Sequence, residues 1–293
     1  MSNNPPFESQ TDTPLFPNAL YNRPLTRHGA GRLLVAGGHS GEFSLPTAIY
    51  QLALAAGLGE CHVVLPDTLA KILGGSPGTY FAASNPSGSL GVEALGKILE
   101  LSETADAVAL GASLSSNSTT AMLIEKLASA IDRPIIFFGD ALTILRHNVQ
   151  VVTDNPKALI IASMPEVFKL CGLLGIPIQI RPNAGLINKL EIVQDLRSAL
   201  ACQVVVYGTE TIDAADTSMV VTPTNYRLAL VPALYYSVLS TFWLQNPSDR
   251  RTGLATGAFV LRQVGDKFSS TDKPTIQALA DALESSLKSQ DDF

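Results

Sequence analysis

The sequence predicts an α/β protein in which one large, mostly parallel β-sheet is covered by helices on both faces. Short aliphatic and β-branched runs alternate with longer helix-like segments along most of the chain, which is the pattern of repeated strand–helix–strand units. Apolar residues make up 46% of the chain and charged residues only 16%, as expected when central strands are buried on both faces. The 293 residues could form two domains or one large unit, and we favour one unit.

The first half of the chain contains three predicted strands. They are expected at Arg32–Ala36, Cys61–Leu65 and Ala107–Leu110. An Ala- and Leu-rich helix is expected over 46–58, and another runs from the capping residues Ser115–Ser118 to about Ala130. Between them, a short helix ends near Leu73, and a Gly- and Ser-rich stretch continues to Gly91. We expect a long loop or small hairpin there, and whether 76–91 forms a lid is left open.

The second half continues the alternation and then changes character. Strands are expected at Pro134–Phe138, Val149–Val152 and Gln203–Tyr207, the last of them preceded by an amphipathic helix over Ala184–Leu200. A short antiparallel pair at Thr211–Asp213 and Ser218–Val221, then two or three helices, should close the fold. Residues 1–20 are polar and proline-rich, so we expect an arm that is flexible or lies over a neighbour, before a single domain over 21–293.

Several classes of function are disfavoured by composition. The net charge of −6 and pI near 5.2, with no Lys/Arg cluster, disfavour a nucleic-acid partner. Cys61, Cys171 and Cys202 are far apart, which indicates neither a disulfide framework nor a metal site. The apolar stretch 228–244 is shorter than the ~20 residues of a membrane span, so a buried helix is expected there. A cytoplasmic protein without a membrane partner is the resulting expectation.

A ligand site is expected where parallel strands end, because loops and helix N-termini meet at that edge. The loops that we assign to this edge are rich in Gly, Ser, Thr and Asn: Gly37–Ser44, Gly111–Asn117, Gly139–Thr143, Thr153–Lys157 and Tyr207–Thr211. Any one of them could be an ordinary turn, but their coincidence favours a cleft. Within it, His39 is a ligand contact or a surface turn residue, and Asp140 is a ligand or metal contact or a helix cap.

Taken in order, these segments resemble the ADP/ATP-dependent NAD(P)H-hydrate dehydratases, relatives of carbohydrate kinases with the ribokinase-like three-layer α/β/α fold. The resemblance runs from about Leu25 to the last helix. It rests on segments similar to that family's motifs: Thr26–Ser40, Ala109–Ser115, Gly139–Leu142 and Thr153–Pro156. It implies ATP or ADP as cofactor, with Mg²⁺ as a candidate ion, and hydrated NAD(P)H as substrate.

The resemblance also implies which residues would line the site. Nucleotide contacts would fall on Gly111, Ser113, Tyr207, Gly208, Thr209 and Asn225, and substrate contacts on His39, Phe43, Ser44, Asp140 and Asn155. The family's Gly-x-Gly-Asp motif, which supplies an anion hole and a proton acceptor, falls on Leu230–Ala233. Pro232 has no amide hydrogen, and Ala233 replaces the Asp, so the phosphoryl-transfer site is expected to be dismantled.

Other family positions differ as well. Tyr-Ser/Thr-Gly-Ala becomes Phe43–Pro46, Lys-Gly becomes Tyr207–Gly208, and His-Pro-Gly-Glu becomes Asn155–Ala158. Three hypotheses stay open: a divergent dehydratase, a non-catalytic homologue that binds a nucleotide or forms a homo-oligomer, and a small-molecule kinase. The first would need a substitute carboxylate, for which the candidates are Asp140, Asp213 and Asp216. The aromatic residues of the helix containing Trp243 are expected to fill the core or a subunit contact.

Overall fold

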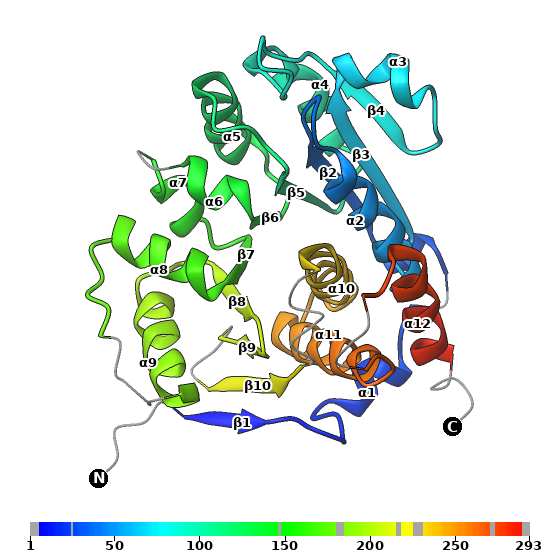
Figure 1. The fold of residues 1–293 in the computed structure, drawn as a ribbon. Coiled ribbons are helices and arrows are strands. Elements are labelled where there is room, and N and C mark those ends of the chain that lie inside the picture. The colour runs from blue at the N-terminus through cyan, green and yellow to red at the C-terminus, as the bar shows by residue number, and fades with distance from the viewer. Residues whose placement is uncertain are drawn as a thin grey trace.

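The computed structural model describes residues 6–24, 26–145, 148–179, 185–214, 218–224, 231–269 and 273–288. A ten-stranded sheet forms its centre (Figure 1). From one edge to the other, its strands are β1 (Phe7–Ser9), β10 (Met219–Pro223), β9 (Glu210–Asp213), β8 (Gln203–Tyr207), β7 (Ala158–Ser163), β6 (Ile135–Phe138), β5 (Ala107–Ala112), β2 (Arg32–Gly37), β3 (Glu60–Pro66) and β4 (Thr79–Ala82). All described neighbours pair in parallel except β9, which is antiparallel to both β8 and β10.

Helices cover both faces of this sheet, as Figure 1 shows. One face carries α1 (Pro17–Tyr21), α2 (Ser44–Ala55), α10 (Pro232–Gln245), α11 (Arg250–Gly265) and α12 (Ile276–Lys288). The other carries α4 (Leu95–Ser102), α5 (Ser118–Ala130), α6 (Asp140–Ile144), α7 (Gln150–Thr153), α8 (Met164–Leu173) and α9 (Gly185–Ser198). The short α3 (Ala70–Leu73) and 3-10 turns at His28–Ala30, Asp67–Leu69 and Val92–Ala94 complete the described helices. The predicted three-layer α/β/α class is therefore confirmed.

Successive side chains along each strand point to opposite faces of the sheet, so the protein has two hydrophobic cores, one on each face. In β2, Leu33 and Val35 pack against α2 and α10, whereas Leu34 and Ala36 pack against the helices of the opposite face. At α5, the Asn117 side chain accepts a hydrogen bond from the Thr119 amide at 2.9 Å, which confirms the predicted cap. α10 has no solvent-exposed face: residues 233–244 are all buried, including the polar Ser237, Ser240 and Thr241, and the helix packs against the sheet, α2 and α11.

The expectation of a flexible arm over residues 1–20 does not hold for residues 6–20. β1 pairs in parallel with β10 at one end of the sheet. The Gln10 side chain, 1% exposed, donates to Thr222 Oγ1 at 3.0 Å and to the Ala255 carbonyl at 2.8 Å. Leu20 is buried in the core. These contacts hold residues 6–20 against the sheet and α11. The buried Gln10 amide is stabilised there because its hydrogen bonds are satisfied by Thr222 and Ala255.

The predicted strand at Val149–Val152 is wrong. The structure places the short helix α7 there, and the strand that continues the sheet is β7, which begins at Ala158. A four-residue apolar run bounded by turn residues fits either a buried helical turn or a strand, so its pattern alone does not decide. As a result, Thr153–Lys157 precedes a strand instead of following one, and it lies at the opposite edge from the other four loops.

The Gly- and Ser-rich stretch after α3 contains more than a loop or hairpin. Its residues Thr79–Ala82 form β4, an edge strand parallel to β3. Only the following segment, in which Ser84 bridges to Leu90, has the expected hairpin form. Strand β4 was not predicted because its short run of aromatic and β-branched residues lies between stretches rich in turn residues.

Candidate functional site

Four of the five loops assigned to a ligand edge do meet there. They follow β2, β5, β6 and β8, whose parallel directions bring their carboxyl ends to one side of the sheet. Two groups of side chains form at this edge. One lies around Asp140 and His39, and the other is a cluster of tyrosines beside the start of α10.

Asp140 begins α6 and holds the neighbouring loop in place. Its Oδ2 accepts a hydrogen bond from the Leu114 amide at 2.9 Å. Partial burial raises the pKa of this carboxyl, while the Leu114 hydrogen bond and the charges of His39 and Lys169 oppose that shift. His39 lies on the facing loop, where its Nδ1 accepts from the Gly41 amide at 3.1 Å. Asp140 is thus a carboxylate at the ligand edge, and one of its two oxygens is hydrogen bonded within the protein.

The residues expected to contact substrate and nucleotide in this group are largely occupied by local contacts. Ser44 donates its hydroxyl to Glu42 Oε1 at 2.6 Å and its amide to the same oxygen at 2.8 Å. These two bonds lower the pKa of Glu42. Phe43 packs against the α2 side of the core. Ser113 has a positive φ of 54°, which marks a tight bend directly after β5.

Gly111 fits tightly against the backbone of β6. A Cβ at this position would lie 1.7 Å from the Phe138 carbonyl oxygen, and the residue has a φ of +129°. Its glycine is therefore required by the close approach of two strands, independently of any ligand.

The hairpin Ser84–Leu90 is fixed across this edge. The Ser40 amide donates to the Gly88 carbonyl at 2.8 Å, and the Ser115 amide donates to Ser89 Oγ at 3.3 Å. Asn85, 6% exposed, donates to Thr119 and Thr120 hydroxyls at 3.1 and 2.9 Å. The hairpin thus connects the loops after β2 and β5 with the first turn of α5.

The second group is an aromatic cluster formed by Phe138, Tyr207, Tyr235 and Tyr236, which we call the tyrosine cluster. Tyr236 stacks on Phe138 with ring centroids 4.1 Å apart, and Tyr207 stacks on Tyr235 at 4.8 Å. The hydroxyls of Tyr207 and Tyr236 lie 3.0 Å apart. All four side chains are buried, with Tyr207 the most exposed at 6%. The cluster fills the space between the ends of β6 and β8 and the first turn of α10.

Burial keeps these hydroxyls protonated. It raises the pKa of Tyr207 and of Tyr235 to about 12, and it shifts the pKa of Tyr236 upward as well. The negative charge of Glu166 also raises the pKa of Tyr207 and Tyr236, because it disfavours a second anion nearby. At neutral pH the cluster can donate hydrogen bonds but cannot act as a base.

The start of α10 contains no acidic residue in its first turn. Pro232 occupies the beginning of the helix and Ala233 follows it, with 3% of its surface exposed. Proline has no amide hydrogen, so it cannot donate to an anion. Gly208, which resembles a nucleotide-binding position, has its carbonyl engaged by the Thr224 hydroxyl at 2.9 Å.

Two residues near the site were missed in the sequence. Glu166 Oε2 accepts from both the amide and the hydroxyl of Ser163, at 2.6 and 2.7 Å, directly after β7. The Ser-x-x-Glu spacing is that of a capping box and could have revealed this helix start. Lys189, from α9, forms an ion pair with Glu210 and reaches Thr209 Oγ1 at 3.4 Å. No local motif indicates Lys189, because its role depends on helix packing.

Several predicted site residues are not brought to this edge. Asn155 lies before β7, at the opposite edge, where its Oδ1 accepts from the Lys157 amide. The family segment assigned to Asn155–Ala158 is therefore misplaced, and Ser163–Glu166 is the segment that follows the strand. Asp213 is 1% exposed within β9, opposite Val205 in the middle of β8. Asp216 and Asn225 lie outside the described residues.

The described residues contain no group of three or more His, Cys, Asp or Glu side chains arranged to hold a metal ion. Over the same described ranges, no helix combines the length and apolar character needed to cross a membrane.

The comparisons with known proteins agree with this fold. The bifunctional NAD(P)H-hydrate repair enzyme Nnr of Moorella thermoacetica is 29% identical over 153 residues, which are 51% of this chain and 29% of that protein. This chain spans about a quarter to two fifths of the length of the curated relatives that it matches.

Solved structures show the same architecture at low identity. A ribokinase-like superfamily protein from Enterococcus faecalis has a TM-score of 0.71 at 16% identity, with 96% of both chains covered. The ADP/ATP-dependent NAD(P)H-hydrate dehydratase from Bacillus subtilis, co-crystallised with ATP/Mg²⁺, has a TM-score of 0.68 at 16% identity, with 99% of this chain and 100% of that chain covered. The model of the family described as NAD(P)H-hydrate dehydratase matches residues 45–226. With well over half of its sequence matched, the chain belongs to the NAD(P)H-hydrate dehydratase family and has the ribokinase-like fold.

Proposed function

We propose that this chain is a divergent member of the family that keeps a nucleotide-type ligand site at the carboxyl edge of the sheet and lacks the standard ATP- or ADP-dependent dehydration of NAD(P)H hydrate. One observation carries this proposal. The first turn of α10 has Pro232 and Ala233 where the resemblance expects an amide donor and a carboxylate, and buried tyrosines pack beside it.

The expected loss of rate follows from what these two groups supply. A preorganised amide donor and a general base each contribute about 10²- to 10³-fold or more to reactions of this type. Protonated tyrosine hydroxyls with raised pKa values do not replace the general base, because they cannot accept the substrate proton. The hydroxyls of Tyr207 and Tyr236 are buried and lie 3.0 Å from each other, so they are not presented to a ligand as donors. Lys189 is a cation beside Thr209, but its pairing with Glu210 offsets the charge that it could offer to a phosphate.

Nucleotide binding is supported by what remains at the edge. The loops after β2, β5 and β8 converge at this edge, and the Bacillus subtilis relative was co-crystallised with ATP/Mg²⁺. The proposed ligand is therefore ATP or ADP, with Mg²⁺ accompanying the phosphates, bound without efficient turnover. The alternative within this family is catalysis by a substitute carboxylate, and Asp140 is the described candidate placed at the edge.

A dehydration assay separates these possibilities. Purified full-length chain is mixed with hydrated NADH and ATP or ADP, and the recovery of NADH is followed by its absorbance. We expect a rate at least about 10³-fold below that of an active relative assayed in parallel. A rate within tenfold of the relative contradicts the proposal. In that case Asp140→Asn, compared with the edge-remote Asp154→Asn, tests whether Asp140 is the substitute base.

A further inference from the structure

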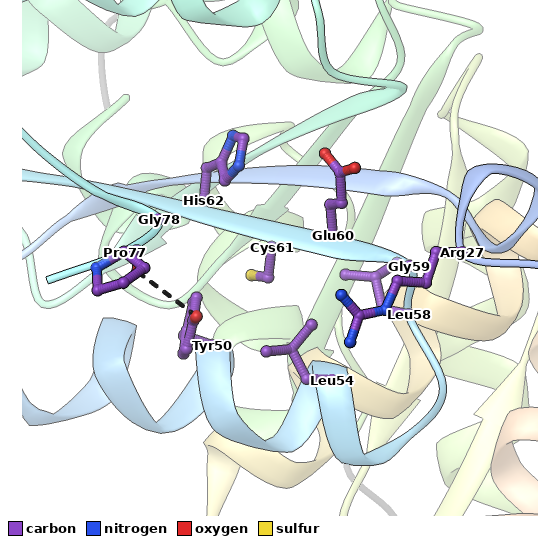
Figure 2. A pocket seen from close by; sticks show the side chains of 10 residues that line it. All are labelled: Arg27, Tyr50, Leu54, Leu58, Gly59, Glu60, Cys61, His62, Pro77 and Gly78. Carbon is purple, nitrogen blue, oxygen red and sulfur yellow. Dashed lines mark hydrogen bonds between the residues drawn. The ribbon is translucent and has the colours of Figure 1, made fainter.

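A cavity lies at the edge of the sheet opposite to the carboxyl ends of the strands, where β3 begins. It has a volume of about 400 Å³, within the range of ligand sites. Figure 2 shows it between the end of α2 and the first residues of β3. We call it the β3-edge pocket, and its lining residues are Arg27, Tyr50, Leu54, Leu58, Gly59, Glu60, Cys61, His62, Pro77 and Gly78. None of these residues takes part in the carboxyl-edge site.

One wall of the β3-edge pocket is an uncovered strand edge. β4 pairs with β3 only from Val63 onward, so no described strand covers Glu60–His62 on that side. The Val63 amide donates toward β4, to the Gly78 carbonyl, whereas the Glu60 amide donates toward β2, to the Gly31 carbonyl. Because backbone groups alternate along a strand, the amide and carbonyl of Cys61 point to the same side as those of Val63. Gly78 lies against the Cys61 carbonyl, since a Cβ on Gly78 would be 3.0 Å from that oxygen, so only the Cys61 amide is left uncovered on this edge. An uncovered strand amide can pair with the backbone of an extended peptide.

Arg27 supplies a fixed cation at one end of the pocket. A Cβ on Gly59 would lie 1.8 Å from the Arg27 carbonyl oxygen, so only glycine lets the two backbones pack this closely. The side chain of Arg27 is exposed and forms no hydrogen bond or ion pair with any described residue. In Figure 2 its guanidinium extends toward Leu54 and Leu58. A guanidinium in this position is suited to bind a carboxylate.

The two faces of the strand differ in character. Tyr50, Leu54 and Cys61 lie on one side of β3, and Glu60 and His62 point to the other (Figure 2). Burial raises the pKa of the Cys61 thiol to about 12, so it contributes an apolar floor and no thiolate. Tyr50 is held at the rim by a 3.5 Å hydrogen bond to the Pro77 carbonyl. A strand added here would place alternate side chains on an apolar and a polar surface.

We propose that the β3-edge pocket binds the carboxyl-terminal end of an extended peptide. The peptide would run antiparallel to β3, accept a backbone hydrogen bond from the Cys61 amide, and place an apolar last side chain against Tyr50 and Leu54. Its terminal carboxylate would then reach Arg27. Backbone pairing, one apolar contact and a carboxylate–guanidinium pair together define this class of ligand.

Calorimetric titration of the full chain with acetyl-Ala-Thr-Phe tests the proposal. We expect submillimolar binding of the free acid and about tenfold weaker binding of its carboxamide, which has lost the charged partner. Arg27→Gln should weaken the acid to the level of the carboxamide and leave the carboxamide unchanged. Leu54→Glu should abolish both, and Arg133→Gln, at an exposed arginine away from the pocket, should change neither.

Four results would overturn the proposal. The first is equal affinity of acid and carboxamide for the unaltered chain, which needs no variant to fold. The second is a preference for the acid that survives Arg27→Gln. The third is binding of 3-phenylpropanoate as tight as that of the peptide, since a small acid makes no backbone pairing with Cys61. Absence of binding up to about 5 mM peptide also rejects it, because a site of this kind should saturate below that range.

Discussion

Replacing Tyr236 with Ala is expected to destabilise the protein by about 3–5 kcal/mol. This side chain is 2% exposed, stacks on Phe138 and hydrogen bonds to Tyr207. Its removal would leave a cavity between β6, β8 and α10 and an unpaired buried hydroxyl on Tyr207. Urea unfolding followed by circular dichroism would measure the loss.

Tyr236→Phe is the matched control, because it keeps the stacked ring and removes only the hydroxyl. We expect it to cost about 1–2 kcal/mol, the range for breaking one buried hydrogen bond. If Tyr236→Ala cost no more than Tyr236→Phe, the ring would not be packed as described. The tyrosine cluster would then be open to a ligand, and the proposed loss of function would lose its structural basis.

Gly111→Ala is expected to prevent folding or to cost more than about 4 kcal/mol. The added methyl group would lie 1.7 Å from the Phe138 carbonyl oxygen, at a φ that L side chains rarely adopt. β5 and β6 would have to separate at the ligand edge to accommodate it. Thermal unfolding and the yield of soluble protein both report this outcome.

The control for this substitution is Gly96→Ala on α4. No atom lies within 4 Å of a Cβ at this exposed helical position, so alanine should stabilise by about 0.5–1 kcal/mol through its higher helix propensity. Normal stability of Gly111→Ala would mean that Gly111 leaves space for a ligand and is not required by strand packing.

Much of the fold follows from local sequence. The apolar runs that begin at Arg32, Cys61, Pro134 and Gln203 form strands, as predicted. Successive apolar side chains in these strands pack into the hydrophobic cores on the two opposite faces of the sheet. The aromatic residues of the helix containing Trp243 were expected to fill the core or a subunit contact, and Tyr235, Phe242 and Trp243 lie in the core. The short antiparallel pair near the end of the sheet also formed as expected.

The errors arose where a short pattern fitted two structures. Val149–Val152 is apolar in either a strand or a helical turn, and assigning it to a strand moved Asn155 to the wrong edge. The side chain of Gln10 is polar, but long-range partners bury it, which composition cannot show. Lys189 meets Thr209 only because α9 packs beside β8. Such contacts depend on tertiary packing, so they cannot be predicted from the spacing of neighbouring residues in the sequence.

We propose that the first turn of α10 does not hold the phosphates of a nucleotide. A crystal structure of the full chain soaked with ATP and Mg²⁺ would show where the phosphates bind. We expect an undisturbed tyrosine cluster, with Tyr207 and Tyr236 still hydrogen bonded, and no phosphate in contact with the backbone of Pro232 or Ala233. An ordered phosphate bound at that turn, with a carboxylate beside it, would show that the phosphate site of the family is retained.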